Sequence, residues 1–341
     1  MNAAVVGAGI VGLAAADSLA RSGVDVRCFE AAEPGSGQSA GHTRVFRHIH
    51  DRADLVELVA RARRGWDEWG ERAGEPLVGN EGVLFASPDA EELAALLAEA
   101  GVEHRVVDEH EQRRLLPVLE PPGGAALYDV RGGAIRAGEA IAALVAGLGE
   151  RLVREEVVAV DRDGLVKTAF GSRRFDRVLV CAGARTSELA EPLGIDLPLE
   201  IRDHTRATLR TRSEHGRLTC WMDRTNAFGA TIYSGPVAAL DAFAVGLATE
   251  DSDPAGSVAR VRAYVERGLP GLDPEPVETI TRPLTILPWH PDAFAIWEAD
   301  AVLVFAGHNL FKFAPVLGDL LADACRGRIG PELRPPNRPS A

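Results

Sequence analysis

Cysteine is scarce in this chain, and the few cysteines are spread too widely to build a metal centre or a disulfide framework. Cys28, Cys181, Cys220 and Cys325 form no Cys-x-x-Cys pair. Zinc sites and disulfide-stapled secreted domains both need cysteines in closely spaced groups. We therefore predict reduced, buried thiols and no bound metal.

Basic residues are fewer than acidic ones, and long apolar runs are scarce as well. The 341 residues include 37 Lys and Arg against 50 Asp and Glu, which gives a formal net charge of -13. This charge disfavours binding to nucleic acid and to anionic membrane surfaces. No segment has the roughly 20 consecutive apolar residues of a membrane helix, and the first apolar segment lacks the basic leader of a secretion signal. We expect a cytoplasmic protein, monomeric or homodimeric, with no nucleic-acid or membrane partner.

Glycine, by contrast, is arranged in a specific pattern at the start of the chain. An apolar run precedes the letters GAGIVGL, and small and apolar residues at helical spacing follow them. In such a strand, turn and helix, Gly7 allows the tight turn and Gly9 lets the backbone approach a pyrophosphate. Gly12 lets the helix pack closely on the strand, and the N-terminus of that helix attracts the phosphates. Residues 3–30 therefore predict a site for the ADP part of a dinucleotide.

Glu30 follows the next predicted strand, residues 24–29, about 20 positions after the glycines. A carboxylate at this place accepts hydrogen bonds from a ribose diol and disfavours a 2′-phosphate. The pattern does not separate NAD from FAD, because both contain the ADP moiety. The choice between them depends on the rest of the sequence.

Further strands and helices are predicted along the chain. Residues 35–48 are too rich in glycine, serine and basic side chains for a packed element, and we expect a loop with hydrogen-bond donors. The predicted helices cover residues 55–69, 91–100, 138–148, 257–267 and 315–325. The predicted strands cover residues 82–87, 102–107, 153–160, 174–180, 207–212, 231–234, 243–247, 281–287 and 301–307. The short strands between residues 206 and 290 indicate a mostly antiparallel sheet, whereas those at 153–160, 174–180 and 301–307 extend a parallel one.

Four motifs along the chain together resemble those of a known family. They are GAGIVGL with Glu30, the loop HTRVFRH, the segment RVLVCAGARTSEL, and the C-terminal FAGHNLFKFAPVLGDLLAD. In this order they resemble the D-amino-acid-oxidase-like superfamily of FAD-dependent oxidoreductases, and within it the monomeric sarcosine oxidases and N-methyltryptophan oxidases. The resemblance implies FAD rather than NAD, bound by a glutathione-reductase-like Rossmann domain. It also implies a substrate domain whose antiparallel sheet roofs the flavin.

The predicted fold class is therefore α/β with α+β character, a FAD-binding Rossmann domain interlocked with an antiparallel-sheet substrate domain. We assign to the FAD-binding domain residues 1–80, 135–205 and 295–341. We assign to the substrate domain residues 81–134 and 206–294.

The resemblance also implies roles for individual site residues. Arg44 corresponds to the family arginine that lies against the flavin face, where a cation stabilises the reduced ring. Arg47 corresponds to the arginine that grips the substrate carboxylate, and Lys312 to the lysine that assists it. His308 lies in a turn that is one residue longer than is usual in the family. Its side chain is equally well explained by a contact with substrate or flavin and by a structural role in the turn.

A set of cofactor-binding residues, spread over much of the chain, follows from the same resemblance. They are Gly7, Gly9, Ile10, Val11, Gly12, Glu30, Ala31, Ser36, Gln38, Ser39, Thr43, Arg44, Val157, Val158, Cys181, Ala182, Gly183, Gly307, His308, Asn309, Leu310, Phe311 and Lys312.

The sequence departs from the family pattern at two places that concern the flavin. Relatives attach the flavin through a cysteine shortly before the C-terminal strand, but residues 281–285 contain none. We therefore predict non-covalent FAD, the alternative being a bond to a histidine such as His42. Relatives also carry a lysine, and a histidine four residues later, in the strand that faces the flavin. Residues 243–248 have neither, which predicts a slow reaction with oxygen unless another cation substitutes.

We expect an enzyme that oxidises the C–N bond of a secondary amine or amino acid with a carboxylate, by hydride transfer to the flavin, to give an imine. Oxygen or another acceptor then takes the electrons. His48, His290 and His308 are candidates for removing the ammonium proton of the amine. Two alternatives stay open: a tailoring oxidase or dehydrogenase of a larger amino acid in a biosynthetic pathway, and a catalytically impaired flavin-binding subunit.

Overall fold

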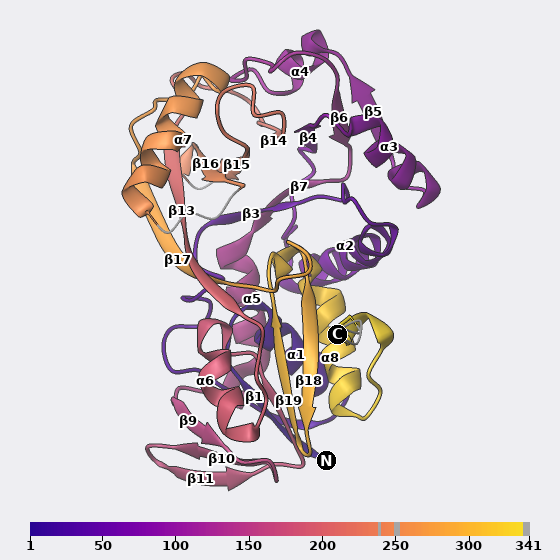
Figure 1. Ribbon diagram of the computed structural model, residues 1–341, viewed down its shortest axis with the longest axis vertical. Helices are drawn as coiled ribbons and strands as arrows, with labels where there is room; N and C mark the ends of the chain where they lie inside the picture. Colours follow the sequence, from indigo (N-terminus) through magenta and orange to yellow (C-terminus); the bar gives the residue numbers. More distant parts are fainter. Residues whose placement is uncertain (238–239, 249–252, 337–341) are drawn as a thin grey trace, which may run out of the picture. The chain divides into compact units, whose positions relative to one another are not determined.

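The computed structural model describes residues 1–237, 240–248 and 253–336, and the chain divides into two compact units (Figure 1). Unit 1 comprises Met1–Ala40, Glu139–Arg202 and Pro283–Ala341. Unit 2 comprises Gly41–Gly138 and Asp203–Arg282. Residues 41–80, which the sequence assigned to the FAD-binding domain, thus belong to unit 2. The end of that predicted domain, residues 337–341, lies outside the described residues.

Unit 1 is built on a six-stranded sheet in the order β18-β19-β12-β1-β2-β8. Its strands are β1 (Asn2–Val6), β2 (Asp25–Phe29), β8 (Leu152–Val153), β12 (Arg177–Val180), β18 (Phe294–Ala299) and β19 (Val302–Gly307). All neighbours are parallel except β18, which is antiparallel to β19. The central strands are short apolar runs with buried side chains, as a parallel sheet covered on both faces requires. The α/β fold class predicted from the sequence is confirmed.

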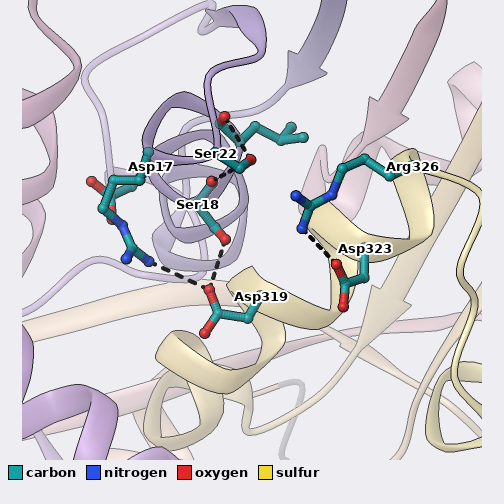
Figure 2. Close-up of polar contacts among 8 residues, drawn as sticks. Asp17, Ser18, Ser22, Asp319, Asp323 and Arg326 are labelled. Atoms are coloured by element: carbon teal, nitrogen blue, oxygen red, sulfur yellow. Dashed lines mark hydrogen bonds and ion pairs between the residues drawn. The ribbon is translucent and has the colours of Figure 1, made fainter. Parts of the chain in front are cut away.

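Helices α1 (Ile10–Arg21) and α8 (Ala314–Cys325) pack against each other in unit 1. They approach closely because Gly318 has no side chain, and a Cβ atom there would lie 2.7 Å from the carbonyl oxygen of Ala14. Ser18 Oγ of α1 donates a hydrogen bond of 2.7 Å to Asp319 Oδ1 of α8 (Figure 2). The last helix of the chain therefore supports the helix that begins at the glycine-rich turn.

A second, three-stranded sheet in unit 1 differs from the prediction. It consists of β9 (Val157–Val160), β10 (Leu165–Thr168) and β11 (Gly171–Arg174) in the order β11-β10-β9. The single strand expected over 153–160 is split into β8 and β9, and that expected over 174–180 into β11 and β12. Gly164 has a φ of +83° and donates to Asp161 O, so the chain reverses there and these strands pair among themselves.

The remaining helices are α5 (Ala137–Leu148) and α6 (Thr186–Ala190) around unit 1, and α2 (Ala53–Ala73), α3 (Ala90–Glu99), α4 (Glu109–Leu115) and α7 (Pro254–Gly268) in unit 2. Short 3-10 helices cover Gly149–Arg151, Gly183–Arg185, Glu191–Leu193, Leu310–Phe313 and Pro331–Leu333. Among the described residues, no helix is both long enough and apolar enough to cross a membrane.

Unit 2 contains an eight-stranded sheet in the order β17-β13-β16-β15-β14-β4-β6-β5. Its strands are β4 (Val83–Ala86), β5 (His104–Val107), β6 (Ala126–Asp129), β13 (Glu200–Arg210), β14 (Cys220–Asp223), β15 (Ile232–Val237), β16 (Ala242–Leu247) and β17 (Glu278–Ile286). Antiparallel pairing dominates, as predicted, although β14 and β4 are parallel. Side chains of α7, such as Tyr264 and Val265, join the apolar cluster on one face.

A two-stranded sheet in unit 2 corrects the prediction of a loop over residues 35–48. β3 (Thr43–Phe46) pairs with β7 (Gly133–Arg136), and Arg44 stands opposite Ile135. A bridge between Val78 and Ile135 extends this contact, which explains why residues 41–80 cluster with unit 2. The pairing partner lies far along the chain, so the local composition alone favoured a loop.

Candidate functional site

The glycine-rich turn in unit 1 has the geometry that the sequence predicts. Gly7 has a φ of +101°, and a Cβ atom on it would lie 2.5 Å from Cys181 O. A Cβ atom on Gly12 would lie 1.9 Å from Gly7 O. Helix α1 begins after Gly9 and has no acidic residue in its first turn. Its N-terminal N–H groups therefore form an end suited to anions, which a pyrophosphate fits.

Glu30 lies directly after β2 and beside this turn. Its Oε2 atom accepts a 2.7 Å hydrogen bond from Ala8 N, and its Oε1 atom accepts one of 3.0 Å from Ala32 N. The backbone thus holds the carboxylate in place while each oxygen keeps a further lone pair for a ribose hydroxyl. Ser39 Oγ accepts from Ile10 N at 3.0 Å, which fixes the following loop against the start of α1. These residues fit the ADP part of FAD.

Two other predicted cofactor residues of unit 1, Gln38 and Gly307, are linked through Thr285. Gln38 Nε2 donates to Thr285 Oγ1 at 3.0 Å, and Thr285 Oγ1 donates to Gly307 O at 2.9 Å. Thr285 therefore links the loop after β2 to the end of β19, a role that the sequence analysis missed. Val158 is an exposed residue of β9.

Lys312 is buried and paired with a carboxylate that the sequence analysis did not single out. Its Nζ atom donates to Asp292 Oδ1 and to Asn309 O, both at 2.9 Å. Both side chains are less than a tenth exposed. His308 is buried next to them along the chain, and its backbone N–H donates to Ala293 O at 3.0 Å. The turn thus joins Lys312 to the segment that precedes β18.

Arg44 in unit 2 belongs to a buried cluster of arginines. Its Nη1 atom donates to Thr43 O at 2.8 Å, and Arg206 Nη1 from β13 donates to the same carbonyl. Burial, followed by the positive charges of Arg282 and Arg206, lowers the pKa of Arg44 well below its usual value. Burial also lowers the pKa of Arg282, and Tyr233 offsets part of this effect.

Two aromatic residues complete this cluster. The Arg206 guanidinium lies 5.1 Å from the centroid of the Tyr233 ring. The Tyr233 hydroxyl lies 2.6 Å from Nε2 of His204, and the two rings are stacked. Arg206, Arg282, Tyr233 and His204 were all missed by sequence reasoning. Arg206 lies directly before the strand predicted over residues 207–212, in a stretch with several polar residues, so the local sequence gave no signal for it.

The remaining predicted polar residues have partners within their own units. Arg47 Nη1 donates to Ile49 O and lies 3.3 Å from His50 Nδ1. His48 is buried, and its Nδ1 atom lies 3.0 Å from Asp129 Oδ1.

Two further histidines that were considered as site residues also make side-chain contacts. His42 is exposed, with Nε2 3.0 Å from Glu278 Oε2. His290 Nδ1 accepts from Asp292 N at 3.0 Å. Within the described part of the chain, no group of His, Cys, Asp and Glu residues is arranged to hold a metal ion.

Comparison with known proteins agrees with this geometry. The profile of the family described as "FAD dependent oxidoreductase" matches residues 2–324. The monomeric sarcosine oxidase of Bacillus sp. (strain B-0618) is 30% identical over 212 residues, which cover 58% of this chain and 54% of that enzyme. The chain thus matches about half the length of this relative. The N-methyl-L-tryptophan oxidase of Salmonella heidelberg (strain SL476) is 26% identical, and the alignment covers 95% of this chain and 94% of the relative.

Solved structures share the fold over nearly the whole chain. NikD, described as an unusual amino acid oxidase essential for nikkomycin biosynthesis, superposes with a TM-score of 0.86 in its open form. The superposition covers 98% of this chain and 97% of NikD at 22% sequence identity.

Proposed function

The chain belongs to the family of FAD-dependent oxidoreductases, and on this premise we propose that it oxidises the C–N bond of a secondary amine or amino acid that carries a carboxylate. The observation that carries the proposal is the glycine turn of unit 1 with Glu30 beside it, in a chain whose relatives include amine oxidases. Bound FAD supplies a two-electron acceptor for the hydride of the C–H bond next to nitrogen, and the resulting imine hydrolyses in water.

The residues of the chain contribute binding and positioning. Gly7, Gly9 and Gly12 would shape the turn for the pyrophosphate, and Glu30 would hold the adenosine ribose. The buried arginines of unit 2, Arg44 among them, attract an anionic substrate and stabilise negative charge near them. We expect FAD to be bound without a covalent link, because residues 281–285 supply no cysteine to attach it, and the alternative is a bond to a histidine such as His42.

A specific observation favours a dehydrogenase over a fast oxidase. Strand β16 reads AFAVGL and is followed by Ala248, so neither lysine nor histidine stands on it. Electron transfer to oxygen creates superoxide, which a nearby cation stabilises, so the dehydrogenase assignment requires that the buried arginines do not take the place of that lysine. We expect the reduced protein to reoxidise slowly in air and faster with an artificial electron acceptor. Stopped-flow absorbance of the reduced flavin measures both rates, and a faster reaction with oxygen would contradict the dehydrogenase assignment.

Product analysis tests the proposed reaction. Turnover of an N-methyl or cyclic amino acid in the presence of an artificial acceptor should yield the carbonyl compound and the amine that arise when the imine hydrolyses. A cyclic substrate gives a cyclic imine, and hydrolysis of this imine opens the ring to a single molecule that carries both the amine and the carbonyl group. Mass spectrometry in ¹⁸O-labelled water identifies these products, because the carbonyl oxygen comes from solvent. Reduced flavin without these products would exclude C–N oxidation.

A further inference from the structure

We propose that Thr285 is a positioning residue of the FAD site in unit 1. Its hydroxyl ties the loop that contains Gln38 to the end of β19 at Gly307, so that both segments are in place for one dinucleotide. This inference deepens the proposed function, because it rests on FAD as the bound cofactor. Every contact that supports it lies within unit 1.

The end of β19 lies at the same edge of the sheet as the glycine-rich turn. Strands β19, β12 and β1 are parallel neighbours, and the carboxyl ends of such strands form the edge at which ligands bind in open α/β sheets. Gly7 follows β1, Cys181 follows β12 and Gly307 ends β19. Two strand spacings, roughly 10 Å, separate β1 from β19, and an extended dinucleotide can span that distance.

The Thr285 hydroxyl contacts both segments at once. Thr285 is 2% exposed, and its single hydroxyl proton is donated to Gly307 O at 2.9 Å. The same oxygen accepts a hydrogen bond of 3.0 Å from Gln38 Nε2. This contact turns the amide nitrogen of Gln38 toward Thr285. A Cβ atom on Gly183 would lie 3.8 Å from Gln38 Oε1, so the amide of Gln38 lies between Thr285 and the turn after β12.

Each of the two segments has a second anchor. Ser39 of the loop accepts a hydrogen bond of 3.0 Å from the backbone N–H of Ile10, the first residue of α1. His308, directly after β19, donates its backbone N–H to Ala293 O at 3.0 Å. The loop is thus fixed to the start of α1, and the turn after β19 is fixed to the segment before β18. Thr285 connects these two anchored segments.

Loss of the hydroxyl should affect the two ends of a dinucleotide differently. Thr285→Val keeps the shape of the side chain but removes the donor to Gly307 O and the acceptor for Gln38 Nε2. Without FAD, the loop and the turn can move to find other partners, whereas bound FAD needs both in one arrangement, so the loss reduces FAD affinity. ADP needs the glycine-rich turn and Glu30 but not the end of β19, and its affinity should be unchanged.

Titration of FAD and of ADP into the full-length apoprotein, followed by calorimetry, tests the role of Thr285. Thr285→Val should bind FAD about 10-fold more weakly than the wild type, the loss typical of an unmade hydrogen bond, and should bind ADP equally well. Thr285→Ser keeps the hydroxyl and should restore the FAD affinity. Thr168→Val is the matched control in unit 1, because it removes a hydroxyl that donates to Glu155 Oε2 at 2.8 Å in the three-stranded sheet. It should leave both affinities unchanged.

A double-variant cycle tests the link between Thr285 and Gln38. Gln38→Ala should weaken FAD binding by itself. If the two side chains act through their shared hydrogen bond, adding Gln38→Ala to Thr285→Val should cause less further loss than Gln38→Ala causes alone. Fully additive losses would overturn the link.

Two further outcomes would overturn the role of Thr285. One is equal FAD affinity of Thr285→Val and the wild type. The other is an equal loss of FAD and ADP affinity, which indicates a general structural defect. Should Thr285→Val not yield folded apoprotein, Gln38→Ala carries the test, and unchanged FAD affinity in that variant would overturn the proposal. A failure of the proposed function is distinguishable, because the wild type would then bind FAD with these affinities while no amine reduces the flavin.

Discussion

At the scale of single residues, the buried charges distinguish this chain. Removing one partner of a buried ion pair destabilises the folded protein, because the other charge is then buried without compensation. Lys312 and Asp292 form such a pair in unit 1, whereas the arginines of unit 2 lie close to one another. In the Lys312–Asp292 pair the opposite charges balance each other. The arginine charges of unit 2 repel one another, and an anion bound among them would reduce this repulsion.

The Lys312 pair gives a stability prediction. Asp292→Asn should lower the free energy of unfolding by about 3 kcal/mol, because it leaves the Lys312 charge buried without its carboxylate. Denaturant unfolding of the holoprotein measures this change. Asp323→Asn removes a carboxylate from more exposed pairs with Arg326 and Arg328, and its effect should stay below about 1 kcal/mol. The double variant Asp292→Asn, Lys312→Met should recover part of the lost stability, and a further loss would contradict the account.

Residue roles could be predicted only where they follow from local sequence. Gly7, Gly12 and Glu30 were identified because their spacing along one strand, turn and helix defines the motif. Arg206 was missed because its partner Thr43 lies 163 positions away in the chain, and Asp292 because its partner Lys312 lies 20 positions away in another element. No periodicity or motif in the sequence predicts such contacts. The roles predicted for Arg44, Arg47 and His308 remain predictions.

At the scale of secondary structure, long periodic segments were predicted better than short ones. The expected helices at 55–69 and 257–267 correspond to α2 (Ala53–Ala73) and α7 (Pro254–Gly268). Their apolar spacing follows the helical repeat, which is a local property. β3 was taken for a loop, because a four-residue strand with glycine and serine before it is defined by its partner β7. Pairing across the chain decides such elements.

The turn between β1 and α1 gives a prediction for one element. Gly12→Ala should abolish FAD retention, because the new Cβ atom would overlap Gly7 O at 1.9 Å and neither backbone segment can move without opening the turn. Gly37→Ala is the matched control in the following loop, since a Cβ atom there meets nothing within 4 Å. Flavin absorbance per polypeptide after purification measures retention. A Gly12→Ala protein as yellow as the control would contradict the assigned role of the turn.

At the scale of the whole molecule, two units are assembled from alternating stretches of one chain. Segments typical of parallel and of antiparallel strands alternate along the sequence, and this alternation predicted the interlocked arrangement. The parallel sheet with its glycine turn was also predicted in outline. The unit boundaries differ for residues 41–80, whose partners lie in unit 2, and for residues 283–294, which were assigned to the substrate domain and belong to unit 1. Family membership connects this architecture with FAD. We propose that the assembled molecule oxidises an amine rather than merely binding flavin.

Anaerobic titration of the holoprotein tests that claim most directly. N-methyl and cyclic amino acids are added without oxygen, and the absorbance of the oxidised flavin is followed. The account predicts that at least one of these amines bleaches the flavin band, since hydride transfer needs no oxygen. A flavin that dithionite reduces but that stays oxidised with every amine in the panel would contradict the account and favour a flavin-binding subunit without amine-oxidising activity.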